Sequence, residues 1–382
     1  MVFFARADDQ LARACYVSVL LPRMNEHQVI LETQEALDAF VADAGRLPDL
    51  VCAIDTEADS LHRYRESLCL VQFAYGERSL LIDPLAIPDL SPLGALLDPA
   101  VVWMHGADYD MTMLKRQFGR LPAVIFDTQI GARLLGLRRF GLADLVQHYF
   151  GVELSKSSQK ADWGKRPLPA KMVEYALNDV HYLLPMGGRI VSELTNKGRY
   201  DWFEESCLAA SKKVMERDDS RDDAWRIQGS GRLDRCGLAY LHALWHWRDR
   251  EAESWDRPSF MVATNRVLLE WSEALAGGRE VALPSHFRPD RIRRFREALA
   301  SVEAMDENSY PLKPKGPRRR RDAGFEKRLD GLLKMRDRVA AELDIDGSLI
   351  AARAVLEGVA ADEVAPSEVL LRWQRGCLGM AE

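Results

Sequence analysis

The stretch "VCAIDTEADS", residues 51–60, begins as a buried strand and ends in acidic residues. Residues 51–54 are apolar and compatible with a β-strand, and Asp55 and Glu57 follow at alternate positions. Because alternate residues of a strand point to the same face, both carboxylates should project together from the end of a core strand. Two acids held close together repel each other and lose hydration. The stretch therefore predicts a site at which something must offset that cost.

The composition is typical of a soluble globular protein. The 382 residues are enough for two or three domains, and 47% of them are apolar and 29% charged. No apolar run has the length needed to cross a bilayer. The six cysteines form no CxxC pair, which indicates a cytoplasmic, reducing location and no cysteine zinc site. The net charge of −6 argues weakly against indiscriminate binding of nucleic acid.

The chain changes character along its length. Residues 1–27 are mildly apolar and basic, and we interpret them as a non-functional extension, with a targeting signal as the alternative. Strands and helices mix up to "VVWMHG", residues 101–106, and everything beyond is predicted to be helical. "TQEALDAFVADAG" predicts a helix capped by Thr33 and stopped by Gly45. The predicted segments are an α/β domain at 28–205, a polar connector at 206–232, a helical domain at 233–305, a basic linker at 306–322 and a second helical domain at 323–382.

Two segments concentrate positive charge. "HFRPDRIRRFR", residues 286–296, is predicted to lie on a helix, and "KPKGPRRRR", residues 313–321, has the Pro and Gly content of a linker. Each is either a solvated segment or a patch that contacts phosphate groups. The sequence leaves both interpretations open.

Two further acidic positions fall on predicted helices. Asp108 and Asp110 lie near the start of a helix, where capping alone explains an acid. Tyr175 and Asp179 are four residues apart and share one face of a later helix. Each position is weak evidence alone, but the order of strand-end acids, helix-start acid and Tyr-x-x-x-Asp pair is distinctive.

That order resembles the ribonuclease D family, the DEDDy subgroup of 3′–5′ exonucleases. The three motifs are "AIDTEAD", "HGADYDMTML" and "YALNDVHYL", and "QKADWGKRPL", residues 159–168, also resembles the family. The two helical segments resemble HRDC domains. The resemblance implies an α/β fold: a ribonuclease-H-like exonuclease domain with a mixed β-sheet flanked by helices, followed by two small all-α HRDC-type domains.

The resemblance also implies what offsets the carboxylate repulsion, namely two divalent ions, Mg²⁺ or Mn²⁺, bound by hard oxygen ligands. Asp55 would bridge both ions. Glu57 and Asp179 would complete the site of one ion, and Asp110 would hold the second. Tyr175 would orient the attacking water or help to deprotonate it.

Several neighbours of these motifs have simpler interpretations. Asp108 is expected at the rim of the site rather than in it, and His105 is expected to be a structural polar residue at a strand-to-helix turn. Asp59 and Glu66 follow the first motif in a predicted loop, where both are expected to be solvated.

The implied substrate is RNA with an unpaired 3′ end, plausibly a transfer-RNA precursor or another stable RNA, bound by a monomer. Gln72 would lie near the 3′-terminal nucleotide. Trp163, Lys165 and Arg166 would contact bases and backbone, although loop packing explains them equally well. The alternatives are a DNA-directed 3′–5′ exonuclease and a catalytically silent nucleic-acid-binding protein. The domain at 28–205 is expected to fold and act without the helical tail.

Overall fold

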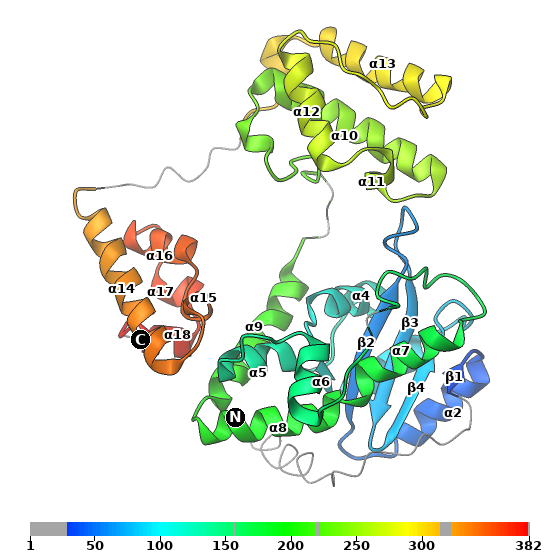
Figure 1. The fold of residues 1–382 in the computed structure, drawn as a ribbon, viewed down its shortest axis with the longest axis vertical. Coiled ribbons are helices and arrows are strands. Elements are labelled where there is room, and N and C mark those ends of the chain that lie inside the picture. Colours follow the sequence, from blue (N-terminus) through cyan, green and yellow to red (C-terminus); the bar gives the residue numbers. More distant parts are fainter. Residues whose placement is uncertain (1–28, 156, 219, 221, 314–321, 381–382) are drawn as a thin grey trace. The chain divides into compact units, whose positions relative to one another are not determined.

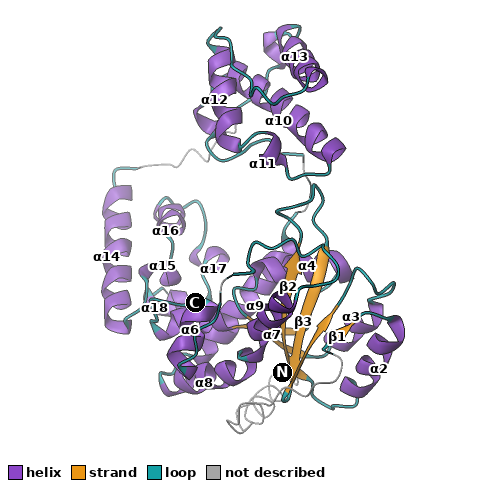
Figure 2. Cartoon of the chain, turned by 45° about the vertical axis from the view of Figure 1, so that its right-hand side comes forward, coloured by secondary structure: helices purple, strands orange, loops and turns teal. Residues whose placement is uncertain are grey.

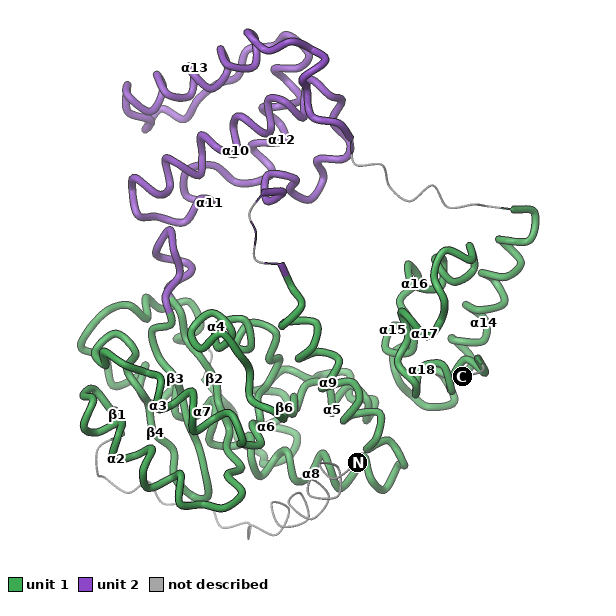
Figure 3. The backbone as a smooth tube through the Cα atoms, turned by 180° about the vertical axis from the view of Figure 1, so that it is seen from behind, with its two compact units in different colours: residues 1–58, 68–217, 319–382 green, residues 59–67, 218–318 purple. Residues whose placement is uncertain are grey.

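The structure is a computed structural model that describes residues 29–155, 157–218, 220, 222–313 and 322–380. The chain forms two compact units (Figure 3). Unit 1 contains residues 1–58, 68–217 and 319–382, and unit 2 contains residues 59–67 and 218–318. The predicted extension at 1–27 and residues 314–321 of the predicted linker lie outside the described residues. Among the described residues, no helix combines the length and the apolar character needed to span a bilayer.

Unit 1 is built on a mixed six-stranded sheet in the order β1-β4-β3-β2-β5-β6 (Figures 1 and 2). Strands β2, β3 and β4 are antiparallel to one another, whereas β1 is parallel to β4, and β5 and β6 run parallel to β2. The strands are β1 Ile30–Leu31, β2 Val51–Ala58, β3 Leu68–Tyr75, β4 Arg78–Ile82, β5 Val101–Met104 and β6 Val124–Asp127.

Helices cover both faces of this sheet, as the sequence predicted. Ile54 and Phe73 point to one face, where they pack with apolar residues of α2, α3 and α4. Ala53 and Trp103 point to the other face, where they pack with α5, α8 and α9. On that second face α7 lies across the strands (Figure 1). The helices are α2 Gln34–Ala44, α3 Ser91–Leu97, α4 Asp108–Phe118, α5 Thr128–Leu135, α6 Leu142–Phe150, α7 Ala170–His181, α8 Leu183–Asn196 and α9 Tyr200–Glu216.

Helix α2 has the predicted ends. The Thr33 hydroxyl accepts a hydrogen bond from the Ala36 backbone N–H at 3.2 Å, and the helix stops at Gly45. The cap satisfies one of the backbone donors that a first helical turn leaves unpaired.

Two predictions for unit 1 are wrong. β6 lies beyond residue 106, in the part of the chain predicted to be wholly helical. Its four residues are too few for periodicity to distinguish a strand from a helix. The predicted boundary at 205 falls inside α9, which continues to Glu216 and buries Cys207 and Val214. A fragment ending at 205 would therefore truncate a helix of the α/β core.

The C-terminal helices pack on the α/β portion of unit 1. Trp373 stacks on Trp202 with ring centroids 5.0 Å apart. The Glu205 carboxylate accepts the backbone N–H groups of Arg372 at 2.8 Å and Trp373 at 3.2 Å. The C-terminal helices thus pack on the segment at 28–205 that is predicted to fold alone. The C-terminal helices are α14 Phe325–Leu343, α15 Gly347–Ile350, α16 Arg353–Ala360, α17 Pro366–Val369 and α18 Arg372–Cys377.

Unit 2 is helical around an aromatic core. Its elements are η1 Ser230–Arg232, α10 Arg235–Trp255, α11 Ser259–Val262, α12 Asn265–Ala276, α13 Pro289–Glu303 and η2 Glu307–Ser309. The buried rings are those of Trp225, Trp245, Trp247, Trp271, Phe287 and Phe295.

Residues 59–67, which connect β2 to β3, belong to unit 2. The Tyr64 hydroxyl donates to Asp249 of α10 at 2.8 Å, and Arg65 pairs with Glu253 at 3.0 Å. Asp59, expected to be solvated, is instead 5% exposed and accepts the Ser67 backbone N–H at 2.7 Å. Its carboxylate closes the base of the loop, a role that only the folded loop reveals.

Candidate active site

The strand-end acids lie on the face of the sheet that α7 covers. Asp55 and Glu57 share this face because they alternate along β2, and Asp55 is opposite Gln72 of β3. The pairing shifts between Glu57 and Ala58, so the strand is irregular directly after the second acid. Oxygen atoms of Asp55, Glu57 and Asp179 lie within 4.8 Å of one another.

Asp110 reaches the same site from the first turn of α4. Its Oδ1 accepts two hydrogen bonds from Thr56, one from the backbone N–H at 3.0 Å and one from the hydroxyl at 2.5 Å. The turn before α4 depends on Gly106, whose φ of +65° is a conformation that side chains disfavour. Asp127 fixes this turn by accepting the N–H groups of Gly106 and Ala107, both at 2.9 Å. Strand end and helix start are therefore held together by carboxylate hydrogen bonds.

The third motif lies on α7. Tyr175 and Asp179 are one turn apart, and their side chains are hydrogen bonded. The Tyr175 ring packs on Trp163, with ring centroids 6.1 Å apart. The three motifs thus meet on one side of the sheet.

The motifs line a cleft of about 410 Å³ within unit 1. No lysine or arginine lines it within the described part of the chain. The lining residues are Asp55, Thr56, Glu57, His105, Tyr109, Asp110, Gly141, Leu142, Ala143, Leu154, Ser155, Gln159, Tyr175 and Asp179.

The electrostatics reflect four acids without a counter-charge. Burial raises the pKa of the Glu57 carboxyl to about 9, and repulsion from Asp179 and Asp110 adds to it. Burial likewise raises the pKa of Asp179 to about 7. Burial also raises the pKa of Asp110, but only to about 6, because the hydrogen bonds from Thr56 partly offset the effect of burial. Burial and the three neighbouring carboxylates raise the pKa of Asp55 well above its usual range. Such displacements are typical of functional sites.

The structure separates Asp110 from its neighbour Asp108. The Asp108 side chain is 67% exposed, pairs with Arg217 at 2.7 Å and is absent from the cleft lining. His105 follows the end of β5, and its Nδ1 lies 2.9 Å from the Thr128 hydroxyl. Both residues have the positions expected for them, a rim acid and a polar residue at a strand-to-helix turn.

Two of the four predicted substrate contacts, Gln72 and Trp163, are buried. Gln72 is fully buried, and Trp163 is 1% exposed behind Tyr175. The Arg166 guanidinium forms a two-point ion pair with Asp83, at 2.5 and 2.8 Å. It also donates to the carbonyl oxygens of Cys69, Trp163 and Lys165.

These contacts give Arg166 and Trp163 a structural role, the packing alternative that the sequence left open. They anchor the loop before α7 to the strands. Only Lys165 presents an accessible charge, with a side chain 75% exposed near Asp162.

Three residues of the site were not predicted. Thr56 and Asp127 position Asp110 through the hydrogen bonds described above. Tyr109 lines the cleft and is 42% exposed. Asp127 had a detectable signal, because it precedes a helix and caps it through the Gln129 N–H at 2.7 Å. Nothing in the sequence distinguishes Thr56 or Tyr109 from structural residues.

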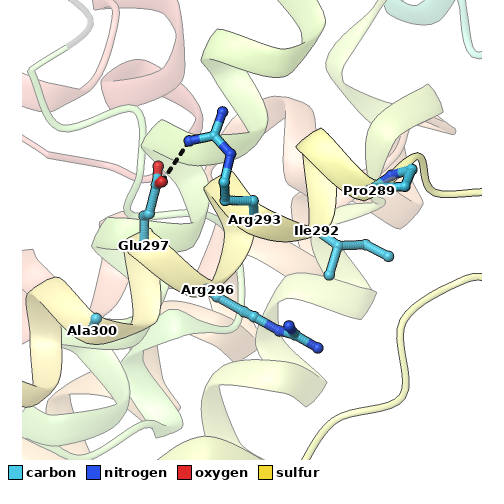
Figure 4. Close-up of a pocket in the computed structure, with 6 residues that line it drawn as sticks. All are labelled: Pro289, Ile292, Arg293, Arg296, Glu297 and Ala300. Atoms are coloured by element: carbon cyan, nitrogen blue, oxygen red, sulfur yellow. Dashed lines mark hydrogen bonds and ion pairs between the residues drawn. The ribbon is translucent and has the colours of Figure 1, made fainter.

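The basic segment at 286–296 forms most of α13 in unit 2. Arg291 and Arg294 bind the buried carboxylate of Glu251, so they serve the core of the unit. Arg293 pairs with Glu297 at 2.6 Å, whereas Arg296 extends away from that pair (Figure 4). An open hollow of about 540 Å³ lies beside these residues. Arg291 and Arg294 therefore have a structural role, which neither of the two interpretations of this segment predicted.

Comparisons with known proteins agree with this site. A protein family described as "3'-5' exonuclease" matches residues 28–197. Ribonuclease D of Musicola paradisiaca is 33% identical over 292 residues, which cover 74% of this chain and 77% of that protein. Ribonuclease D of Sphingobium indicum is 31% identical over 361 residues, 88% of this chain and 92% of that protein.

A solved structure extends the likeness to nearly the whole chain. Escherichia coli RNase D, described as an exoribonuclease involved in structured RNA processing, matches with a TM-score of 0.69 and 25% identity. The match covers 93% of this chain and 99% of that one. With the three motifs gathered in one cleft and relatives matching over most of their length, this chain belongs to the ribonuclease D family of 3′–5′ exonucleases.

Proposed function

We propose that the protein removes nucleotides hydrolytically from the unpaired 3′ end of RNA, with two divalent ions held by Asp55, Glu57, Asp110 and Asp179. The observation that carries this proposal is the carboxylate cluster. Oxygens of Asp55, Glu57 and Asp179 lie within 4.8 Å of one another, and Asp110 lines the same cleft. Carboxylates at this density need cations, and no lysine or arginine is among the described residues that line the cleft.

The donor set fits Mg²⁺ or Mn²⁺. All candidate ligands are carboxylate oxygens, which hard divalent ions prefer, and no sulfur or imidazole nitrogen belongs to the described cluster. Two bound ions would supply an activated water and neutralise the charge that develops on the leaving oxygen. The central position of Asp55, whose charge interacts with all three other acids, suits the bridging role. Glu57 and Asp179 would hold one ion and Asp110 the other.

Thr56 fixes the contribution of Asp110. Its two hydrogen bonds occupy Oδ1, so Oδ2 is the oxygen left for an ion. Thr56 thus sets the orientation of a ligand and is a positioning residue.

Tyr175 would position the attacking water. Burial and then the charges of Asp179, Glu57 and Asp55 raise the pKa of its phenol, so the hydroxyl keeps its proton. A protonated hydroxyl beside Asp179 can hold a water by hydrogen bonding. Positioning is the first of the two predicted roles and the one proposed here.

The cleft suggests how an RNA end would bind. Tyr109 and Leu142 offer an aromatic and an apolar surface beside the acids, on which a base can stack. Lys165 presents an exposed charge on the loop before α7. These groups replace Trp163 and Gln72 as the proposed substrate contacts. Transfer-RNA precursors fit the substrate class, and the helical modules would act as HRDC-type domains of a cytoplasmic monomer.

A cleavage assay with the full chain tests the proposal. Single-stranded RNA and DNA of one sequence, each labelled at the 5′ end, are incubated with Mg²⁺, Mn²⁺ or a chelator. We expect progressive 3′ shortening of RNA with either ion and none with the chelator. Shortening of DNA alone would indicate the DNA-directed alternative. Binding of both strands without cleavage under every condition would indicate a silent binding protein.

A further inference from the structure

Two histidines of unit 2 face each other across one turn of α10. His242 and His246 are four residues apart, a spacing that places both side chains on one helix face. Their Nε2 atoms lie 3.2 Å apart, and the ring centroids are separated by 4.5 Å. Both rings are half-buried. Neither residue lines the nuclease cleft; both lie in the helical segment that resembles an HRDC domain.

We propose that His242 and His246 form a binding site for one late first-row transition ion, such as Zn²⁺, Ni²⁺ or Cu²⁺, with both Nε2 atoms as ligands. Imidazole nitrogen suits these ions, whereas Mg²⁺ and Mn²⁺ prefer the carboxylate oxygens of the nuclease cleft. The chain would then carry two metal sites of different chemistry, one in each unit.

The distance between the two nitrogens matches a chelate. Zinc-to-imidazole bonds of about 2.0–2.1 Å at a tetrahedral angle place two ligand nitrogens about 3.4 Å apart, and a right angle places them about 2.9 Å apart. The observed 3.2 Å lies between these values. Little movement of either ring is needed to accept an ion.

Neighbouring aromatic rings hold the two imidazoles in place. Trp225 meets His242 edge to face at 5.0 Å and 87°, and Trp245 meets His246 at 5.1 Å and 86°. Both tryptophans are buried in the core of unit 2. A ligand pair fixed by packing loses little side-chain entropy when it binds an ion.

The surrounding charges favour neutral rings that can act as ligands. Burial lowers the pKa of both imidazoles. Arg226 lowers the pKa of His242 further. At His246, Arg250 lowers the pKa and Asp249 raises it. The Arg226 charge is partly neutralised by Asp223 at 2.9 Å. Asp249 supplies the negative charge nearest along the helix, with its Oδ2 accepting the Tyr64 hydroxyl.

Metal binding at this pair requires no net gain or loss of protons. In the metal-free pair one neutral ring donates its Nε2 proton to the other. When an ion binds, that proton moves to Nδ1 of the same ring through solvent, and both Nε2 lone pairs face the metal. Among the described residues no third acid, cysteine or histidine completes this group, so water would fill the remaining positions.

The test uses the full chain with Mg²⁺ in excess, which occupies the carboxylate cleft. Cu²⁺ is added in equal amount to the protein, and electron paramagnetic resonance reports the nitrogen ligands, while calorimetry with Ni²⁺ reports affinity. His242→Ala and His246→Ala are compared with the parent. We expect the two-nitrogen signal to disappear in both variants and the Ni²⁺ affinity to fall at least about tenfold.

The matched control is His286→Ala, which removes an exposed histidine of the same unit. We expect this variant to keep the parental signal and affinity. Circular dichroism without metal checks folding, and His246→Gln replaces the alanine variants if they unfold. Parental binding by a folded variant of either histidine would overturn the proposal, as would equal loss of binding in His286→Ala.

Discussion

The chain contains two kinds of buried acid, and they behave oppositely. Asp110 and Asp179 are 6% and 8% exposed, and no described arginine or lysine lines their cleft. Glu251 of α10 is 3% exposed but contacts Arg291 and Arg294 of α13. Burial alone would raise the pKa of all three carboxyls. At Glu251 the hydrogen bonds and charges of the two arginines outweigh burial, and the pKa is lowered.

The source of the counter-charge distinguishes the two cases. At Glu251 the protein provides its own cations, so the cluster is complete and contributes to the packing of unit 2. At the nuclease cleft no described lysine or arginine lines the site, and the proposed metal ions would supply the charge from solution. A buried acid by itself therefore says little about function until its partners are known.

Asp55→Asn should produce the largest effect. The substitution removes the central charge of the cleft but keeps the shape of the side chain. The proposed metal ions, which would stabilise the transition state by several kcal/mol, would no longer bind. We expect nuclease turnover to fall by about 10³-fold or more, without loss of folding. Metal-free stability should hold or rise because repulsion is relieved.

Single-turnover rates with saturating metal measure this effect. The matched control is Asp108→Asn, which removes an exposed acid from the same motif region and should change the rate by less than about threefold. A folded Asp55→Asn protein with parental activity would contradict the site assignment.

Tyr175→Phe should have the next largest effect. The ring and its packing on Trp163 remain, and only the hydroxyl beside Asp179 is lost. We expect turnover to fall by about 10²-fold or more, with RNA binding nearly unchanged, because the hydroxyl acts on the attacking water. Single-turnover rates and a binding titration separate the two quantities. Tyr182→Phe, which alters a tyrosine outside the cleft lining, is the control; equal effects in both variants would assign Tyr175 a packing role.

Glu251→Gln tests the compensated cluster. The variant leaves Arg291 and Arg294 without their carboxylate, although both retain some access to water. We expect unit 2 to lose about 2 kcal/mol of stability, less than for a fully enclosed pair. Hydrogen exchange of peptides from α10 and α13 localises the loss. Glu270→Gln, which breaks the exposed pair with Arg266, should cost under about 0.5 kcal/mol. Similar losses of stability in both variants would show that the buried ion pairs of Glu251 stabilise the protein no more than the exposed Arg266–Glu270 pair does.

The two sites should also respond oppositely to pH. The raised pKa of Glu57 means that the metal-free folded state binds a proton which the unfolded state releases, so stability falls as pH rises from about 4 to about 9. Glu57→Gln removes the contribution of Glu57, while the raised pKa values of Asp110 and Asp179 leave a smaller slope of the same sign. The lowered pKa of Glu251 gives stability that is present above its unfolded value and is lost as pH falls through its folded value.

Denaturant unfolding of each variant and the parent across this range, with a chelator present, measures both slopes. Added Mg²⁺ should restore the stability of the parent at high pH. A Glu57→Gln variant with the same pH slope as the parent would show that Glu57 is not protonated in the metal-free fold.

Local rules explain why much of the site could be predicted from sequence. Alternation along β2 places Asp55 and Glu57 on one face in any sheet, and the four-residue spacing places Tyr175 and Asp179 on one face of any helix. The helices with strong periodicity, α10 and α14, lie where their apolar residues predicted them. These features depend only on neighbours along the chain.

What the sequence by itself determined was thus the set of acids, the order of the motifs and most of the elements that carry them. Only the tertiary structure decided which polar residues face the cleft and which support it. Arg166 and Asp83 are 83 residues apart, and Trp373 reaches Trp202 from the far end of the chain. No local pattern encodes such pairs, because a charged or aromatic side chain has the same propensity whether a partner buries it or leaves it in water.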